Sequence, residues 1–236
     1  MKVFVAAFCI VRNEMMKYPF AIFDMDGTLL DSMGYWRNLG GDYLKQRGIE
    51  VPKDLQDKLR AKSLEESARL YQDQFGLTEP IEEIIEGFYA LIADNYRYRI
   101  QLKPGVMEFL QDLKNAGVKM CIATATYDQV AMPALERLGI LSFFEFVMDC
   151  RKTGGKTSPA VYDAAAARLG GDRTNTMVFE DAPHAVMTAH EAGYYVVGIH
   201  EPVMIGAEEQ IKEIADYYIK DYRYAEVRQH FLGFYA

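Results

Sequence analysis

This sequence of 236 residues has few cysteines, no excess of positive charge and no long hydrophobic run. The three cysteines, Cys9, Cys121 and Cys150, are far apart and lack the spacing of metal ligands, which argues against a disulfide framework and fits a reducing cytoplasm. The formal net charge of −8 argues against a polyanionic ligand such as nucleic acid. No repeat or low-complexity linker is visible, and half of the residues are apolar, so we predict a globular protein.

The first sixteen residues are predicted to be an N-terminal extension that adds nothing to a functional site. Their apolar run, Val3 to Val11, is well below the ~18 residues expected of a membrane span. No clear small-residue cleavage site follows it, so a signal peptide is not predicted. We therefore expect no membrane segment and a cytoplasmic protein.

The stretch that follows joins a strand to a pair of acids. The apolar run Phe20–Phe23 ends at Asp24 and Asp26, and Gly27 can supply the turn that leaves the strand. Alternation along an extended chain sends both carboxylates to the same side, and open parallel sheets bind ligands beyond the carboxyl ends of their strands. An Asp-Gly hairpin turn is the alternative, but Thr28–Leu30 does not resemble a partner strand. We interpret the two acids as part of a functional site.

Apolar residues recur at helical spacing between about residues 34 and 100, where no strand is predicted. We expect helices near residues 35–48, 52–60, 63–75 and 81–98, the third of them beginning with a capping box formed by Ser63 and Glu66. Four successive helices do not fit an alternation of strands and helices. This segment is therefore predicted to be a compact insertion, a candidate helical cap over the neighbouring site.

From about residue 101 onward, strands and helices alternate. We predict helices at 106–116, 129–138, 159–169 and 183–192, strands at 118–124, 145–149, 176–180 and 194–199, an edge strand at 216–220 and a helical tail. This alternation predicts an α/β fold, a Rossmann-like doubly wound parallel sheet covered on both faces. The expected domains are a core of residues 17–33 and 101–236 with the cap, residues 34–100, inserted between them.

Two later segments carry groups that can bind phosphate. Thr124 ends an apolar strand, where its hydroxyl and nearby backbone N–H groups can donate to a phosphate oxygen, although a threonine at a strand end is ordinary on its own. Lys156 lies just before a predicted helix and can neutralise a transferring phosphoryl group and keep a carboxylate ionised. A solvated lysine in a turn is the alternative, and Lys152 is a second candidate for the same role.

A further apolar strand ends in two adjacent acids, Glu180 and Asp181. Adjacent carboxylates repel each other unless a cation offsets their charge. Oxygen ligands gathered beside a phosphate suit Mg²⁺, which prefers few protein carboxylates together with water and substrate oxygens. Helix capping would explain Asp181 but leaves Glu180 unexplained, so the pair predicts a Mg²⁺ site.

Together these motifs resemble those of the haloacid dehalogenase-like superfamily, in particular its phosphatases and phosphomutases. The run Asp-Met-Asp-Gly-Thr-Leu-Leu-Asp-Ser at 24–32 resembles the first motif of that family. Thr124, the Gly-Lys-Thr-Ser-Pro segment around Lys156, and Glu180 with Asp181 are similar to the second, third and fourth motifs, in the same order. Thr157 stands where the third motif usually has proline.

The resemblance implies roles for these residues. Asp24 would be a nucleophile that becomes an aspartyl-phosphate, Asp26 would be a general acid and base, and Thr124 and Lys156 would stabilise the phosphoryl group. Asp181 would ligate Mg²⁺, and Glu180 would do so directly or through water. Asp24 and the backbone carbonyl of Asp26 would complete the protein ligands.

We predict a Mg²⁺-dependent phosphohydrolase acting on a small phosphorylated metabolite such as a sugar phosphate, as a monomer or weak homodimer. Asp26 argues against a dehalogenase of the same superfamily, because a leaving halide needs no proton. Phosphate monoesters require accelerations approaching ~10²¹, whereas one acid-base group contributes only ~10² to 10⁴, so a composite site is expected. Met33, Tyr35, Trp36 and Arg37 lie where a cap would meet the leaving group. Tyr35 and Trp36 can instead belong to the core of the cap, which is the favoured interpretation of Trp36.

Three alternatives stay open at this stage. A sugar-phosphate mutase of the β-phosphoglucomutase type needs a second phosphate site, for which that branch uses a cap arginine. The matching stretch, residues 61–64, lacks this arginine, although Arg60 or Lys62 can substitute for it. Lys62 also allows phosphonoacetaldehyde hydrolysis through a Schiff base. A non-catalytic phosphometabolite sensor is the third alternative, but a sensor has no use for a nucleophile such as Asp24.

Overall fold

The computed structural model describes residues 17–59, 62–204 and 206–233. The predicted extension, residues 1–16, and Arg60 lie outside the described residues. Six strands form one parallel sheet in the order β3-β2-β1-β4-β5-β6. The strands are β1 (Phe20–Phe23), β2 (Lys119–Thr124), β3 (Phe144–Asp149), β4 (Thr176–Glu180), β5 (Tyr195–Ile199) and β6 (Tyr217–Ile219). The predicted doubly wound α/β fold is confirmed.

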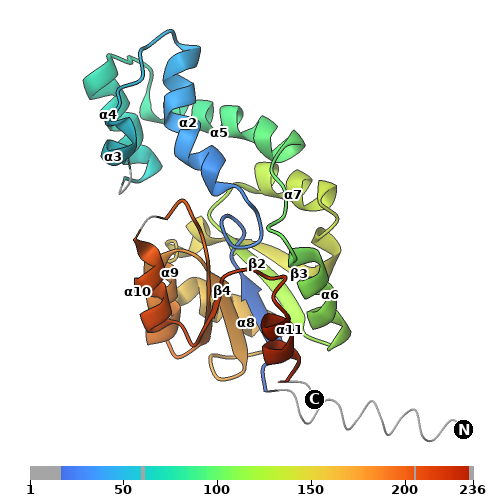
Figure 1. Ribbon diagram of the computed structural model, residues 1–236. Helices are drawn as coiled ribbons and strands as arrows, with labels where there is room; N and C mark the ends of the chain where they lie inside the picture. The colour runs from blue at the N-terminus through green and yellow to red at the C-terminus, as the bar shows by residue number, and fades with distance from the viewer. Residues whose placement is uncertain (1–16, 60–61, 205, 234–236) are drawn as a thin grey trace, which may run out of the picture.

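Helices cover both faces of this sheet (Figure 1). One face packs on α6 (Val106–Asn115), α7 (Asp128–Arg137) and α11 (Ala225–Leu232), and the other packs on α8 (Ala160–Leu169), α9 (Pro183–Glu191) and α10 (Ala207–Ile214). Alternation along β1 divides its side chains between the two layers, because Ala21 and Phe23 face the first set of helices and Ile22 faces the second. Both faces are therefore apolar, as expected for a parallel sheet.

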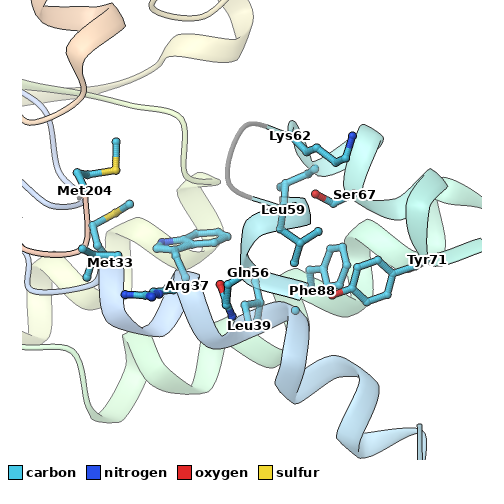
Figure 2. A pocket seen from close by; sticks show the side chains of 14 residues that line it. Met33, Arg37, Leu39, Gln56, Leu59, Lys62, Ser67, Tyr71, Phe88 and Met204 are labelled. Atoms are coloured by element: carbon cyan, nitrogen blue, oxygen red, sulfur yellow. The ribbon is translucent and has the colours of Figure 1, made fainter. Parts of the chain in front are cut away.

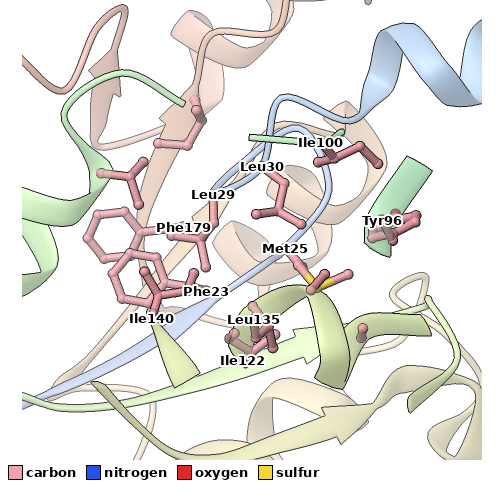
Figure 3. Close-up of a cluster of buried hydrophobic side chains, with 14 of the residues drawn as sticks. Phe23, Met25, Leu29, Leu30, Tyr96, Ile100, Ile122, Leu135, Ile140 and Phe179 are labelled. Atoms are coloured by element: carbon pink, nitrogen blue, oxygen red, sulfur yellow. The ribbon is translucent and has the colours of Figure 1, made fainter. Parts of the chain in front are cut away.

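The larger hydrophobic layer contains phenylalanine rings among aliphatic side chains (Figure 3). Phe23 of β1 stacks on Phe179 of β4 with ring centroids 4.2 Å apart, and Phe109 of α6 meets Phe179 edge-on at 5.8 Å. All three rings are buried. This packing holds the carboxyl ends of β1 and β4 next to each other, immediately below the acids that follow them.

Four helices lie together at one end of the molecule, beyond the loop that follows β1 (Figure 1). They are α2 (Met33–Gln46), α3 (Leu55–Leu59), α4 (Leu64–Phe75) and α5 (Ile81–Tyr98). The predicted capping box is present, since the Ser63 hydroxyl accepts from the Glu66 N–H and the Glu66 carboxylate accepts from the Ser63 N–H. No helix in the described part of the chain combines the length and hydropathy needed to cross a bilayer.

The structure differs from the prediction at α10, a helix that was not predicted. This helix is eight residues long, and Ile211 is its one fully buried residue. Ala207, Ile211 and Ile214 recur at helical spacing and pack on the second layer, so the sequence does carry a local signal for this helix. Short 3₁₀ turns at Leu141–Phe143 and Cys150–Thr153 were also not predicted.

Candidate active site

The predicted site residues follow neighbouring strands that end at the same edge of the sheet. Phe23 of β1 pairs with Ile122 of β2 on one side and with Phe179 of β4 on the other. The Asp24 N–H continues this ladder by donating to the Phe179 carbonyl at 2.9 Å. Parallel pairing therefore brings the acid after β1 beside the acids that end β4.

Lys156 lies between two of these carboxylates. Its Nζ donates to Asp24 Oδ1 and, at 2.5 Å, to Glu180 Oε1, and its side chain is only 9% exposed. Burial opposes the lysine charge, but the Asp24 and Glu180 carboxylates outweigh it and raise the pKa of Lys156, which therefore stays a cation. The Tyr162 hydroxyl of α8 also donates to Glu180 Oε1, at 3.0 Å. The solvated-turn interpretation of Lys156 is thus wrong.

Asp181 lies against the turn that follows β1. The Thr28 hydroxyl donates to Asp181 Oδ1 at 3.1 Å. Gly27 has a φ of 84° and touches the same carboxylate so closely that a Cβ at this position would overlap Asp181 and Met33. Burial, reinforced by the charges of Asp24 and Glu180, raises the pKa of Asp181 well above its usual value. Asp181 is therefore a buried acid next to Asp24 and Glu180.

Three buried acids, Asp24, Glu180 and Asp181, can hold a cation together. Each offers an oxygen atom, and these atoms lie within 4.8 Å of one another. Asp24 Oδ2 and Glu180 Oε2 are buried and have no hydrogen-bond partner among the described residues, which is costly unless a ligand completes them. Carboxylate oxygens in this number suit a hard divalent ion, so the residues fit a metal site.

Asp26 belongs to a different set of contacts. Its Oδ1 accepts from the Ser32 hydroxyl at 2.7 Å and from the Tyr96 hydroxyl, and its Oδ2 accepts from the Thr126 hydroxyl at 2.7 Å. The indole N–H of Trp36 in turn donates to the Tyr96 oxygen at 2.8 Å. Burial and the nearby Asp24 charge raise the pKa of Asp26 above its usual value. The three hydroxyl donors act in the opposite direction without reversing this shift.

Thr124 is buried at the end of β2, and its hydroxyl accepts from the Thr126 N–H at 3.0 Å. This contact shapes the loop that carries Thr126 to Asp26. The donation from Thr124 to a phosphate stays a prediction. Sequence reasoning did not single out Tyr96, Tyr162 or Thr126 as site residues. Only the position of Thr126, two residues beyond a strand end, was a usable local signal.

A cavity of about 300 Å³ lies beside this centre, lined by α2 to α5 and by Val203 and Met204 of the core (Figure 2). Met33 and Met204 lie at one end, and Tyr71 and Ser67 at the other, with Arg37 between them. Of the residues expected near a leaving group, Met33, Trp36 and Arg37 line the cavity, whereas Tyr35 does not. Lys62 lines it as well.

Comparison with known proteins identifies the family. A sequence model of the haloacid dehalogenase-like hydrolases matches residues 21–199, and the chain belongs to this family. (DL)-glycerol-3-phosphatase 1, mitochondrial, of Arabidopsis thaliana is 29% identical over 185 residues, a match that covers 75% of this chain but only 62% of that protein. β-Phosphoglucomutase of Bacillus subtilis is 27% identical over 209 residues, covering 83% of this chain and 89% of that protein.

Among solved structures, a putative β-phosphoglucomutase from Thermotoga maritima superposes with a TM-score of 0.76 at 22% identity, covering 89% of this chain and 98% of that one. A likeness at this level of identity shows the fold. Family membership and the phosphatase relative together support a hydrolase that removes phosphate.

Proposed function

We propose that this protein is a Mg²⁺-dependent phosphohydrolase that removes phosphate from a small phosphorylated metabolite through an aspartyl-phosphate at Asp24. The observation that carries this proposal is the position of Asp24. Its two oxygens differ, because Oδ1 accepts from Lys156, whereas Oδ2 is buried beside Glu180 and Asp181 and has no hydrogen-bond partner in the described part of the chain. A carboxylate held on one side, with a lysine for the transferring group, is suited to attack phosphorus.

Asp24, Glu180 and Asp181 would hold the cation, and the backbone carbonyl of Asp26 is the fourth proposed protein ligand. When bound, Mg²⁺ would neutralise charge on the phosphoryl oxygens and help to orient them for in-line attack.

The reaction takes place in two displacements. The Asp24 carboxylate forms a bond to phosphorus as the ester P–O bond breaks, and Asp26 gives its proton to the leaving oxygen, which departs as an alcohol. Asp26, now a carboxylate, then takes a proton from water as the water oxygen attacks phosphorus, and the Asp24–phosphorus bond breaks to release inorganic phosphate. Lys156 and Thr124 stabilise the phosphoryl group throughout. Both enzyme acids end in their initial state.

Residues 34–100 are proposed as a cap whose cavity receives the leaving group. The cavity is mainly apolar, with Trp36 and Phe88 on its walls, and Arg37 and Lys62 add positive charge. A sugar phosphate or similar metabolite is the proposed substrate class. The same two cations support the second candidate, a sugar-phosphate mutase, because each can bind a second phosphate.

A cytoplasmic location and a monomeric or weakly dimeric state remain predictions. The free buried thiols of Cys121 and Cys150 agree with a reducing compartment.

Phosphate release tests the proposal. Wild type and Asp24→Asn would be assayed with p-nitrophenyl phosphate and a panel of sugar and polyol phosphates, with Mg²⁺ and after treatment with EDTA. We expect release that needs both Mg²⁺ and Asp24, and a loss of at least ~10⁴-fold in Asp24→Asn, as when other enzymes lose a nucleophile. No release from any substrate, together with interconversion of sugar-phosphate isomers, would replace hydrolysis by the mutase. Binding of phosphate esters without either reaction would favour the non-catalytic sensor over both enzymes.

A further inference from the structure

The hydrogen-bond donors around Asp26 include residues outside the sequence motifs. Its three donors come from three different segments: Ser32 precedes α2, Tyr96 lies in the last turn of α5, and Thr126 follows β2. Two of them therefore lie where the chain enters and leaves the four-helix segment, and the third belongs to the sheet. The Asp26 carboxylate is the point at which these segments meet.

Tyr96 is itself held from two sides. The Trp36 N–H donates to its hydroxyl oxygen, so the same hydroxyl accepts from Trp36 and donates to Asp26. Arg137 of α7 donates to the Tyr96 backbone carbonyl at 3.1 Å and also to the Ile100 carbonyl, which ties the end of α5 to the core. The Tyr96 side chain is 1% exposed. Such a tyrosine has little freedom to turn away from Asp26.

We propose that Tyr96 is a positioning residue that orients the Asp26 carboxyl group for proton transfer, and that Trp36 connects this group to the cavity. The inference rests on the proposed hydrolysis. Trp36 lines the cavity, and its indole packs edge-on against both Tyr96 and Tyr89, with ring centroids 6.3 Å and 6.1 Å apart. The cavity proposed for the leaving group is thus lined in part by the ring whose N–H donates to Tyr96.

The chemistry of the three hydroxyls fits this role. Ser32 and Tyr96 both donate to Oδ1, which fixes the rotation of the carboxyl group and leaves Oδ2 with Thr126. A threonine hydroxyl accepts as well as donates, so Thr126 accommodates Asp26 with or without its proton. The Trp36 N–H already donates to the Tyr96 oxygen, and a tyrosine hydroxyl is ordinarily protonated at neutral pH, so Tyr96 is the donor in its hydrogen bond with Asp26. Tyr96 thus orients the acid without exchanging a proton.

The test removes the Tyr96 hydroxyl and compares two leaving groups. Tyr96→Phe keeps the ring and deletes the donor to Asp26. An alkyl phosphate, the glycerol or sugar phosphate that wild type cleaves fastest, needs a proton from Asp26 as its ester bond breaks, whereas p-nitrophenolate leaves without one. We expect kcat/KM for the alkyl phosphate to fall about 10- to 100-fold, since a misplaced catalytic group costs up to ~10². For p-nitrophenyl phosphate we expect a change below about threefold, because kcat/KM reports only the steps up to the phosphoenzyme.

Tyr43→Phe is the matched control. Tyr43 lies in α2, is 1% exposed like Tyr96, and its hydroxyl has no hydrogen-bond partner among the described residues. Removing that hydroxyl should leave kcat/KM for both substrates unchanged. An equal loss on both substrates in Tyr96→Phe would assign Tyr96 a structural role, and no loss on either would remove the role altogether. Both outcomes overturn the proposal.

A second readout does not depend on turnover. Trp36 is the only tryptophan of the chain, so fluorescence excited at a wavelength that tyrosine does not absorb reports its environment alone. Tyr96→Phe removes the acceptor of the indole N–H and should change the emission maximum, whereas Tyr43→Phe should not. Unchanged emission in Tyr96→Phe would overturn the connection to Trp36. If wild type hydrolyses no substrate, the proposed function fails, and the emission still decides whether Trp36 and Tyr96 are connected.

Discussion

Asp24 and Asp26 are two residues apart, yet they lie in opposite environments. A lysine and two further acids surround Asp24, whereas Asp26 is surrounded by the neutral hydroxyls of Ser32, Tyr96 and Thr126. A lysine favours the ionised form of a carboxylate that it contacts. Neutral hydroxyls can accommodate a carboxyl group in either protonation state. Two identical side chains can therefore take different parts in one reaction because their neighbours differ.

Replacing Asp26 should have the largest effect and should distinguish the role of Asp26 from that of Asp24. In Asp26→Asn the amide can keep its contacts with Ser32 and Thr126, so the fold should persist while the acid-base group is lost. We expect kcat/KM for alkyl phosphates to fall by ~10² to 10⁴, with a much smaller loss for p-nitrophenyl phosphate. Asp42→Asn, at an exposed acid of α2 that pairs with Lys45, is the control. A loss of equal size on both substrates would contradict the acid-base assignment of Asp26.

Removing Lys156 should change the surroundings of Asp24. Lys156→Met leaves Asp24, Glu180 and Asp181 without their buried cation, so we expect phosphate release to fall by ~10² to 10³ for good and poor leaving groups alike. The loss should be uniform because Lys156 contacts the nucleophile and not the group that protonates the leaving oxygen. Steady-state assays and circular dichroism would be measured beside Lys212→Met, which changes an exposed lysine of α10. A loss confined to alkyl phosphates would assign Lys156 to the proton-transfer step.

The turn between the two acids can be tested at Gly27. An alanine there would need both a φ of 84° and space that Asp181 and Met33 already occupy. We expect Gly27→Ala to destabilise the protein by ~1–3 kcal/mol and to lower activity by about tenfold, because Asp181 must shift. Thermal unfolding and phosphate release would be compared with Gly34→Ala, whose added Cβ meets nothing within 4 Å. Full activity in Gly27→Ala would mean that the position of Asp181 is not critical.

The smallest effect is expected at Tyr162. Its hydroxyl donates to Glu180, and when this hydroxyl is removed Glu180 still has its hydrogen bond from Lys156. Tyr162→Phe should therefore cost ~0.5–1.5 kcal/mol at most and raise the Mg²⁺ concentration needed for half-maximal activity by less than about tenfold. Tyr194→Phe, which removes a donor to Asp163 outside the site, is the matched control. A loss as large as that of Lys156→Met would give Tyr162 a role as important as that of the lysine.

Most of the helices and strands could be predicted because their signals are local. The Ser63–Glu66 capping box and the apolar strands that end at Asp24 and Glu180 each depend on residues within a few positions of one another. The helix α10 was missed although its signal is also local, since Ala207, Ile211 and Ile214 recur at helical spacing.

The sequence by itself determined which strands end in acids and therefore the meeting of Asp24, Glu180 and Asp181, because parallel strands end at one edge of a sheet. Lys156 comes from the loop between β3 and α8. Only the tertiary structure decided which side chains surround them. The sequence contains 16 tyrosines, and nothing near Tyr96 distinguishes it from the others. It reaches Asp26, 70 positions earlier in the chain, because the packing of α5 on α2 and α7 brings it there. Contacts between distant segments depend on packing, which no local pattern encodes.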